Sequence, residues 1–200
     1  MRANNLVFKC TSLIMTVMVI VSCAGNDVAG VRTDALDDAL WNASEWISAS
    51  DADVVTGRIS GRNWRAADGA SWFVSEVEND KKVVSAVWMT TALGVYDIYV
   101  NGNLVGEEIL KPGFTHYAKT RYSFTYDVTD LLDKSAGAEN VFSAQVTPGW
   151  WGDKIITPDG HEGMIGKKCA FRSVLELTYS DGSKEYFNTD TENWKAGIAG

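Results

Sequence analysis

The feature that most constrains this 200-residue sequence is a β-hairpin pattern within residues 91–132. Apolar residues there alternate with polar or amphipathic ones, the period of two that turns one face of a strand toward a core. The alternating residues are Tyr96, Ile98 and Val100. Asn101-Gly102 follows, and both residues tolerate the positive φ angles of a type I′ turn, whose twist matches two flanking strands. With a return strand that begins at Leu104, this stretch predicts an antiparallel sheet.

Further alternating runs repeat this pattern along the chain, separated by turn signals such as Asn79-Asp80 and Asp181-Gly182. The expected strands cover residues 71–77, 83–90, 122–126, 141–146 and 173–179, and Tyr186-Phe187 lies on a return strand. We expect Asp127 and Thr129 to cap the tight turn after the strand at 122–126. Roughly eight to ten short strands and no long helical period predict an all-β fold, an antiparallel β-sandwich of the jelly-roll type.

The net charge and the number of aromatic residues limit the functions that this chain can have. A nucleic-acid binder needs a basic surface, whereas this chain has a formal net charge of −8 at pH 7, so we expect no nucleic-acid partner. The eight Trp, seven Tyr and seven Phe residues allow two interpretations. Their rings either fill a sandwich core, which is favoured for any single ring, or form a face on which sugar rings pack.

Residues 1–22 have the pattern of an export signal. Arg2 and Lys9 are followed by an apolar run at residues 13–21, which is too short to span a bilayer as a helix. The run ends at Ser22-Cys23, which resembles a bacterial lipobox, and we expect lipidation of Cys23. The alternatives are an ordinary signal peptide or a short anchor that happens to contain a cysteine. Lipidation predicts an exported protein held at the cell envelope as an outer-membrane lipoprotein.

The remaining chain divides into a tether and a folded body. Residues 23–40 are small, polar and acidic and are expected to form a linker, and residues 41–200 the sandwich domain. Leu36, Leu40 and Trp41 are spaced to form one face of a short helix at this boundary.

Only three cysteines occur in the sequence. With Cys10 in the signal segment and Cys23 lipidated, Cys169 is left alone, so we expect neither an intramolecular disulfide nor a zinc site. We expect Cys169 to be a small buried residue.

A Trp-Trp pair at the end of the strand at 141–146 is the strongest candidate for a binding site. The candidate substrate-binding residues are Trp150, Trp151, Asp153, Lys154 and His161. Neighbouring side chains diverge, so one indole can enter the core while the other remains at the surface, where Asp153 and Lys154 can bond sugar hydroxyls. The alternatives are that both indoles cover the end of the sandwich and that His161 is a solvated loop residue.

No pair of catalytic carboxylates stands out. A glycosidase needs two carboxyl groups facing each other across the scissile bond. Glu107-Glu108 is the most conspicuous acidic pair, but adjacent strand residues point to opposite faces, and we interpret it as a solvated turn. The residues therefore indicate neither a catalytic centre nor a metal site.

Several spaced segments of residues 72–200 form a pattern that is specific because they occur together. They are Ala92-Leu93-Gly94-Val95-Tyr96, Asn101-Gly102, Val105-Gly106, Pro112-Gly113, Tyr117, Tyr126-Asp127-Val128-Thr129-Asp130-Leu131-Leu132, Gly149-Trp150-Trp151, Asp181-Gly182 and Trp194-Lys195-Ala196-Gly197. With these segments, the chain closely resembles the amino-terminal β-domain of bacterial α-L-rhamnosidases.

The resemblance implies a part of an inverting glycoside hydrolase that removes terminal α-L-rhamnose from glycans. In that family the catalytic carboxylates belong to an (α/α)6 barrel hundreds of residues further on, so no residue here inherits a catalytic role. The expected partners are a rhamnose-containing glycan, such a barrel in a longer product, and a membrane through the lipid anchor. In some relatives a domain of this kind resembles a rhamnose-binding module that uses calcium, but no residue here is assigned to calcium and no other cofactor is expected. We therefore expect an accessory domain without hydrolytic activity of its own; the alternative is an autonomous carbohydrate-binding lipoprotein.

Overall fold

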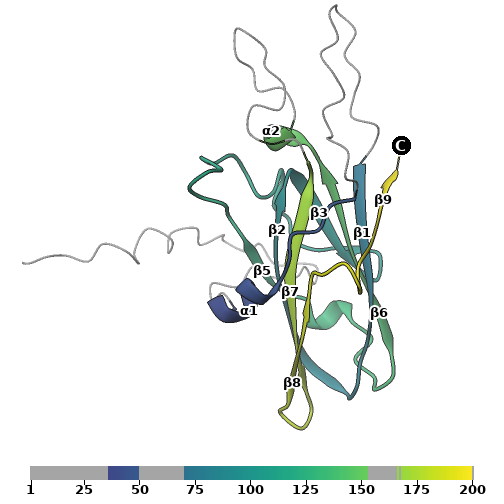
Figure 1. The fold of residues 1–200 in the computed structure, drawn as a ribbon. Helices are drawn as coiled ribbons and strands as arrows, with labels where there is room; N and C mark the ends of the chain where they lie inside the picture. The colour runs from purple at the N-terminus through teal and green to yellow at the C-terminus, as the bar shows by residue number, and fades with distance from the viewer. Residues whose placement is uncertain (1–35, 50–69, 153–165, 167, 200) are drawn as a thin grey trace, which may run out of the picture.

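The computed structural model of the chain describes residues 36–49, 70–152, 166 and 168–199. In these residues nine strands form two antiparallel sheets that stack on one another (Figure 1). The first sheet has the order β4 (Asn103–Leu104), β3 (Val95–Val100), β6 (Glu139–Thr147), β1 (Ala70–Glu78) and β9 (Lys195–Ala199). The second has the order β5 (Phe124–Asp127), β2 (Val83–Leu93), β7 (Ala170–Tyr179) and β8 (Lys184–Asn188). The short helices are α1 (Asp38–Ala43), α2 (Gly149–Gly152) and the 3-10 helix η1 (Thr129–Leu131). The predicted all-β antiparallel sandwich is confirmed.

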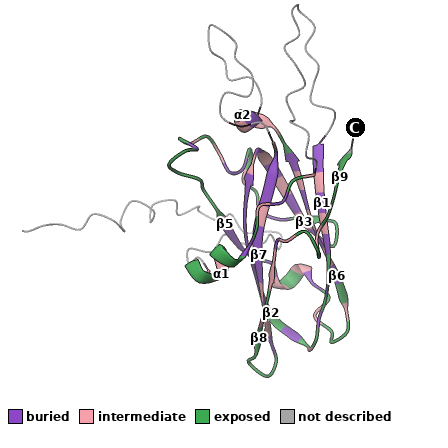
Figure 2. Ribbon diagram, in the orientation of Figure 1, coloured by how far each residue is buried: buried purple, intermediate pink, exposed green. Residues whose placement is uncertain are grey.

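The hydrophobic core lies between the two sheets and is built largely from aromatic rings. Phe73 of β1 stacks on Phe171 of β7 with ring centroids 5.9 Å apart, and Trp88 of β2 meets Phe142 of β6 edge-on at 5.1 Å. All four rings are buried. Figure 2 shows buried residues along the strands and exposed ones at the hairpin tips and on α1. For these rings, the interpretation as sandwich core is confirmed.

The central hairpin folds as predicted. Asn101 and Gly102 have φ angles of 50° and 80°, as a type I′ turn requires, and Leu104 pairs with Tyr99. The Asn101 side chain also forms a hydrogen bond outside the turn, because its Nδ2 donates to Asn140 Oδ1 at 2.8 Å. Asn140 is fully buried, and its own Nδ2 donates to the carbonyl oxygen of Asp133 at 3.0 Å. The buried Asn140 amide thus connects the hairpin turn to the loop between η1 and β6.

The strand expected at residues 122–126 is shifted in the structure. β5 covers Phe124–Asp127, and Tyr122 is exposed. The pairing of β2 with β5 ends at Thr90 and Phe124, and beyond it the Thr91 hydroxyl donates to the Tyr122 carbonyl oxygen at 2.6 Å. A hydrogen bond from a side chain therefore replaces the backbone hydrogen bonds between the two strands at this point. The predicted cap is confirmed, because the Thr129 amide donates to Asp127 Oδ1 at 3.0 Å.

Residues 36–49, the N-terminal segment, complete the second sheet. β8 pairs with β7 only between Val174 and Thr178. Past Val174 the N-terminal segment takes over the edge of β7, where Ile47 and Phe171 exchange backbone hydrogen bonds of 3.0 and 2.9 Å. The predicted short helix is present as α1, which starts after the N-cap Asp37, so Leu40 and Trp41 lie in it as expected but Leu36 precedes it.

Several sequence-based predictions fall outside the described residues. These are the signal segment 1–22, the lipidated Cys23, and the candidate site residues Asp153, Lys154 and His161. Cys169 is described and buried as predicted, and burial raises the pKa of its thiol to about 12. Among the helices of the described residues, none combines the length and the apolar character needed to cross a membrane.

Candidate functional site

Trp150 and Trp151 lie in α2, a single turn that follows β6 at one end of the sandwich (Figure 1). The amides of Trp151 and Gly152 both donate to the Pro148 carbonyl oxygen at 3.1 Å. Gly149 has a φ of 45°, and a Cβ there would lie 2.4 Å from Val95 Cγ2. Only glycine fits both the conformation and the space, so the sharp turn that presents the two indoles depends on it.

The two indoles belong to an aromatic cluster with Phe114 and Tyr117 of the loop before β5. Ring centroids are 5.4 Å apart for Tyr117 and Trp151, and 6.3 Å apart for Phe114 and Trp150. Both pairs meet edge to face, the favourable arrangement for aromatic rings. The two loops therefore hold each other through rings that lie far apart in the sequence.

The two indoles have different environments within the aromatic cluster. Trp151 is fixed, because its Nε1 donates to the Lys168 carbonyl oxygen at 2.7 Å. Trp150 packs against Phe114, which is 58% exposed. Both indoles are half-buried, so neither one enters the core and both help to cover the end of the sandwich. Trp150 and Phe114 together leave an accessible apolar edge at this end of the sandwich.

Phe114 and Tyr117 are the members of the cluster that the sequence-based search for a binding site did not select. Two aromatic residues three positions apart, just after the Pro112-Gly113 turn, would have been the available signal. The Tyr117 hydroxyl donates to the Gly113 carbonyl oxygen at 3.2 Å, and burial raises the pKa of Tyr117. Tyr117 is thus a neutral positioning group within the cluster.

Lys111 lies buried in the same loop. Its Nζ donates to the Val105 carbonyl oxygen at 2.9 Å and lies 5.6 and 5.3 Å from the ring centroids of Tyr96 and Tyr126. Burial lowers the pKa of Lys111. The Tyr126 hydroxyl donates to Glu108 Oε2 at 2.9 Å. The interpretation of the acidic pair as a solvated turn is therefore wrong for the half-buried Glu108, although Glu107 is exposed.

A pocket, which we call the arginine pocket, lies where the N-terminal segment meets β2, β7 and the residues before β5. Its volume is about 260 Å³, and its lining consists of Trp41, Trp46, Thr91, Arg121, Tyr122, Ser123 and Arg172. Arg172 Nε donates to Ser44 Oγ at 2.8 Å, and its guanidinium carbon lies 4.6 Å from the Trp41 ring centroid. Sequence analysis missed this pocket, because its residues come from separate segments that only the fold brings together.

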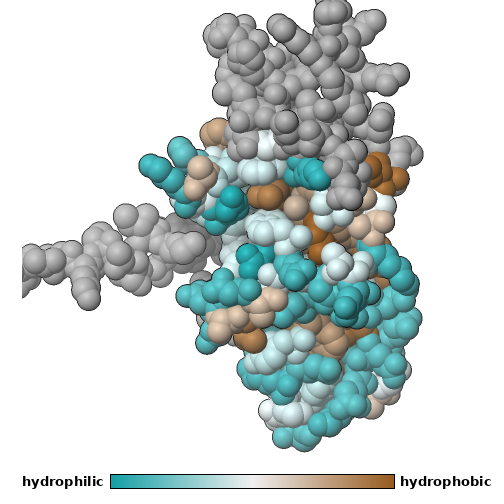
Figure 3. Space-filling view, in the orientation of Figure 1, coloured by the Kyte–Doolittle hydropathy of each residue, from teal (hydrophilic) through white to brown (hydrophobic). Residues whose placement is uncertain are grey.

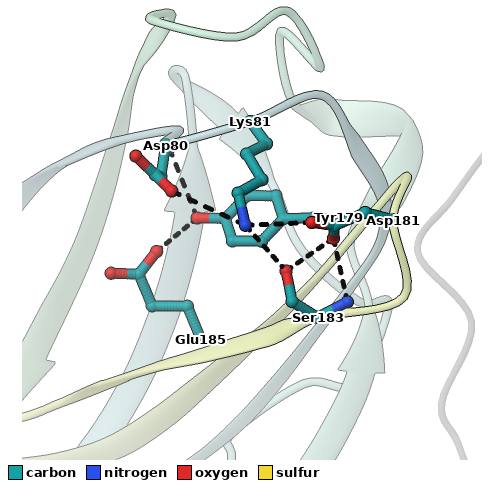
Figure 4. A network of polar contacts seen from close by, with 6 residues as sticks. All are labelled: Asp80, Lys81, Tyr179, Asp181, Ser183 and Glu185. Carbon is teal, nitrogen blue, oxygen red and sulfur yellow. Dashed lines mark hydrogen bonds and ion pairs between the residues drawn. The ribbon is translucent and has the colours of Figure 1, made fainter.

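The polar network in Figure 4 is structural. It lies at the end of the sandwich opposite α2 and connects the β1–β2 turn to the β7–β8 turn. Lys81 Nζ donates to Asp181 Oδ2 at 3.0 Å and to Ser183 Oγ at 3.2 Å (Figure 4). The Tyr179 hydroxyl donates to Glu185, and burial together with this bond raises the pKa of Tyr179 to about 12. These contacts hold two hairpin turns together and leave no group poised for catalysis.

The carboxyl groups with shifted pKa values are not suited to acid catalysis. Hydrogen bonds from Ser183 and then from Lys81 lower the pKa of Asp181, and the Ser135 amide and hydroxyl lower that of Asp133. For Asp190, partial burial is outweighed by hydrogen bonds from Asn193 and Glu192, and its pKa is also lowered. A glycosidase general acid requires a raised pKa. Within the described part of the chain, no group of three or more His, Cys, Asp or Glu residues is placed to hold a metal ion.

A comparison with protein families and a comparison with known proteins point to the same group of enzymes. Residues 81–199 match the family described as alpha-L-rhamnosidase N-terminal domain. An alpha-L-rhamnosidase of Alteromonas sp. (strain LOR) is 32% identical over 176 residues, which are 88% of this chain and 18% of that protein.

Two solved structures extend the comparison. The native alpha-L-rhamnosidase of Aspergillus terreus superposes with a TM-score of 0.68 at 29% identity, covering 79% of this chain and 17% of that one. The apo form of a Pleurotus ostreatus lectin superposes with a TM-score of 0.50 at 25% identity, covering 80% of this chain and 36% of that one. The chain therefore spans less than a fifth of the rhamnosidases that it matches.

Proposed function

The chain belongs to the alpha-L-rhamnosidase N-terminal domain family, and on that premise we propose that it is the accessory, sugar-binding domain of an α-L-rhamnosidase. In this role it contacts rhamnose-bearing glycans, and a separate (α/α)6 catalytic domain cleaves the terminal rhamnose. The domain itself supplies no acid or base to the reaction.

The observation that carries the sugar-binding role is the accessible edge of the aromatic cluster. Phe114 is 58% exposed and lies beside the half-buried Trp150, and its ring also meets that of Tyr117 edge-on, with centroids 6.0 Å apart. Rings that are already immobilised lose little conformational entropy when a ligand binds. L-rhamnose, with its methyl group and C–H faces, offers more apolar surface to such rings than a fully hydroxylated hexose.

The resemblance to the Pleurotus ostreatus lectin supports the same role. Lectins bind sugars without cleaving them. It also favours a second candidate function, an autonomous carbohydrate-binding protein, which would use the same aromatic surface without a catalytic partner.

Isothermal titration of the full chain with L-rhamnose tests the proposal. We expect saturable binding, and we expect Trp150→Ala and Phe114→Ala each to weaken it about tenfold, roughly 1.4 kcal/mol. Tyr186→Ala is the matched control, because Tyr186 is an exposed aromatic residue on β8 and lies outside the aromatic cluster. The absence of binding at millimolar rhamnose, or an equal loss in Tyr186→Ala, would overturn the proposal.

A further inference from the structure

The arginine pocket concentrates positive charge on an acidic protein. The chain has a formal net charge of −8, yet among the described residues the lining of this pocket includes Arg121 and Arg172 and no Asp or Glu. Because the lining otherwise consists of aromatic rings and hydroxyl groups, it combines anion recognition with surfaces for a sugar ring. We propose that the arginine pocket binds a hexuronic acid unit, with its carboxylate at the arginines and its pyranose ring against the aromatic side chains of the lining, which include the exposed Tyr122.

Arg172 is held in place before any ligand arrives. Its Nε donates to Ser44 Oγ at 2.8 Å, and an Nη group donates to the Trp41 carbonyl oxygen. The guanidinium also lies over the indoles of Trp41 and Trp46, 4.6 and 5.9 Å from their centroids. A planar guanidinium fixed in this way is suited to the planar, two-oxygen geometry of a carboxylate.

Arg121 supplies the second charge from the other side of the pocket. Its side chain is exposed, but the adjacent backbone is anchored, because the Tyr122 carbonyl oxygen accepts the 2.6 Å hydrogen bond from the buried Thr91. The approach of α1 to β7, visible in Figure 1, brings Trp41 to Arg172, so that the N-terminal segment contributes Trp41 and Trp46 to the lining of the pocket. Two separately anchored segments thus present the two cations.

The size and composition of the pocket select the ligand class. A volume of about 260 Å³ is below the roughly 300–1,000 Å³ of pockets for drug-sized ligands, so it suits a single sugar unit. A neutral sugar would leave the charge of the two arginines unused, and a small inorganic anion would leave the exposed aromatic surface of the lining unused. A carboxylate-bearing pyranose uses both.

Isothermal titration of the full chain with D-galacturonic acid, D-galactose and acetate tests this inference. Galactose has the pyranose ring without the carboxylate, and acetate has the carboxylate without the ring. We expect galacturonic acid to bind at least about tenfold more tightly than either, and to bind more weakly as ionic strength rises. Equal affinity for galactose or for acetate, or no binding of galacturonic acid at millimolar concentration, would show the inference to be wrong.

Two charge-removing variants locate the site. Arg121→Gln is expected to weaken galacturonic acid binding about tenfold. Lys119→Gln removes an equal charge from an exposed residue of the same loop that does not line the pocket, and it is expected to bind as the unmodified chain does. If the two variants behave alike, the arginine pocket is not the site.

The result is separable from the test of the proposed function. None of the residues lining the arginine pocket belongs to the aromatic cluster, so Arg121→Gln is expected to keep its affinity for rhamnose. Failure of rhamnose binding would leave the galacturonic acid result unaffected.

Discussion

Buried tyrosine hydroxyls and a buried lysine make the stability of this domain depend on pH in the alkaline range. Tyr96 is fully buried with its hydroxyl 3.0 Å from Thr90 Oγ1, and burial raises its pKa well above the ordinary value of 10.0. The neighbouring Lys111 is shifted the other way, since burial lowers its pKa below 10.5. The free energy of unfolding therefore responds to pH through two opposed groups.

The sign of each contribution follows from which state holds more protons. For Lys111, the unfolded chain binds the proton more tightly, so stability rises with pH until 10.5, above which the residue is neutral in both states. For Tyr96, the folded chain keeps the proton after the unfolded chain has lost it, so its contribution is complete below pH 10.0 and is lost as pH rises.

We predict that Tyr96→Phe flattens the alkaline loss of stability. Between about pH 10.5 and 12, the free energy of unfolding of the variant should fall less steeply, by about 1.4 kcal/mol per pH unit, because one proton is no longer retained on folding. Urea denaturation followed by circular dichroism measures both slopes. Tyr122→Phe, which removes an exposed hydroxyl, is the control expected to keep the original slope, and an unchanged slope in Tyr96→Phe would contradict the prediction.

At the level of strands and helices, features that depend on neighbouring residues can be predicted from the sequence, whereas contacts between distant segments cannot. Most of the strands and the Asn101-Gly102 turn were predictable, because alternation and turn chemistry lie within a few residues, whereas the edge strand β9 was not expected. The pairing of Ile47 with Phe171 was not, since nothing local in the N-terminal segment specifies a partner so far along the chain. The same reason explains the candidate site: Trp150 and Trp151 stand out as neighbours, whereas their ring partners Phe114 and Tyr117 come from another loop.

We predict that the N-terminal segment is an integral part of the sandwich. Ile47 is 4% exposed and belongs to the core, although it lies outside the residues that match the family. Ile47→Ala should therefore lower the free energy of unfolding by about 2–5 kcal/mol, measured by urea denaturation. Ile198→Ala is the matched control, since Ile198 is 51% exposed on β9, and it should change stability by less than about 0.5 kcal/mol. Similar small effects in both variants would mean that the segment packs only loosely.

At the scale of the whole molecule, the two ends of the sandwich have different characters. The hairpin end is hydrophilic on the face shown in Figure 3 and is tied together by the polar network of Figure 4. The end near α2 carries the aromatic cluster, and both it and the arginine pocket draw on the loop before β5. The proposed ligand contacts thus depend on one loop supported by a rigid sandwich, an arrangement typical of binding sites.

This arrangement predicts that the chain alone does not hydrolyse rhamnosides. Inverting hydrolysis needs one carboxylic acid with a raised pKa and one carboxylate on the opposite face of the sugar. The shifted pKa values of Asp133, Asp181 and Asp190 are all lowered, which keeps these groups ionised at neutral pH and unable to protonate a leaving group. Incubation of the purified chain with 4-nitrophenyl α-L-rhamnopyranoside should release nitrophenol no faster than buffer does, while an intact α-L-rhamnosidase under the same conditions turns it over. Release that scales with the concentration of the chain would place a catalytic pair within it and would refute its assignment as an accessory domain.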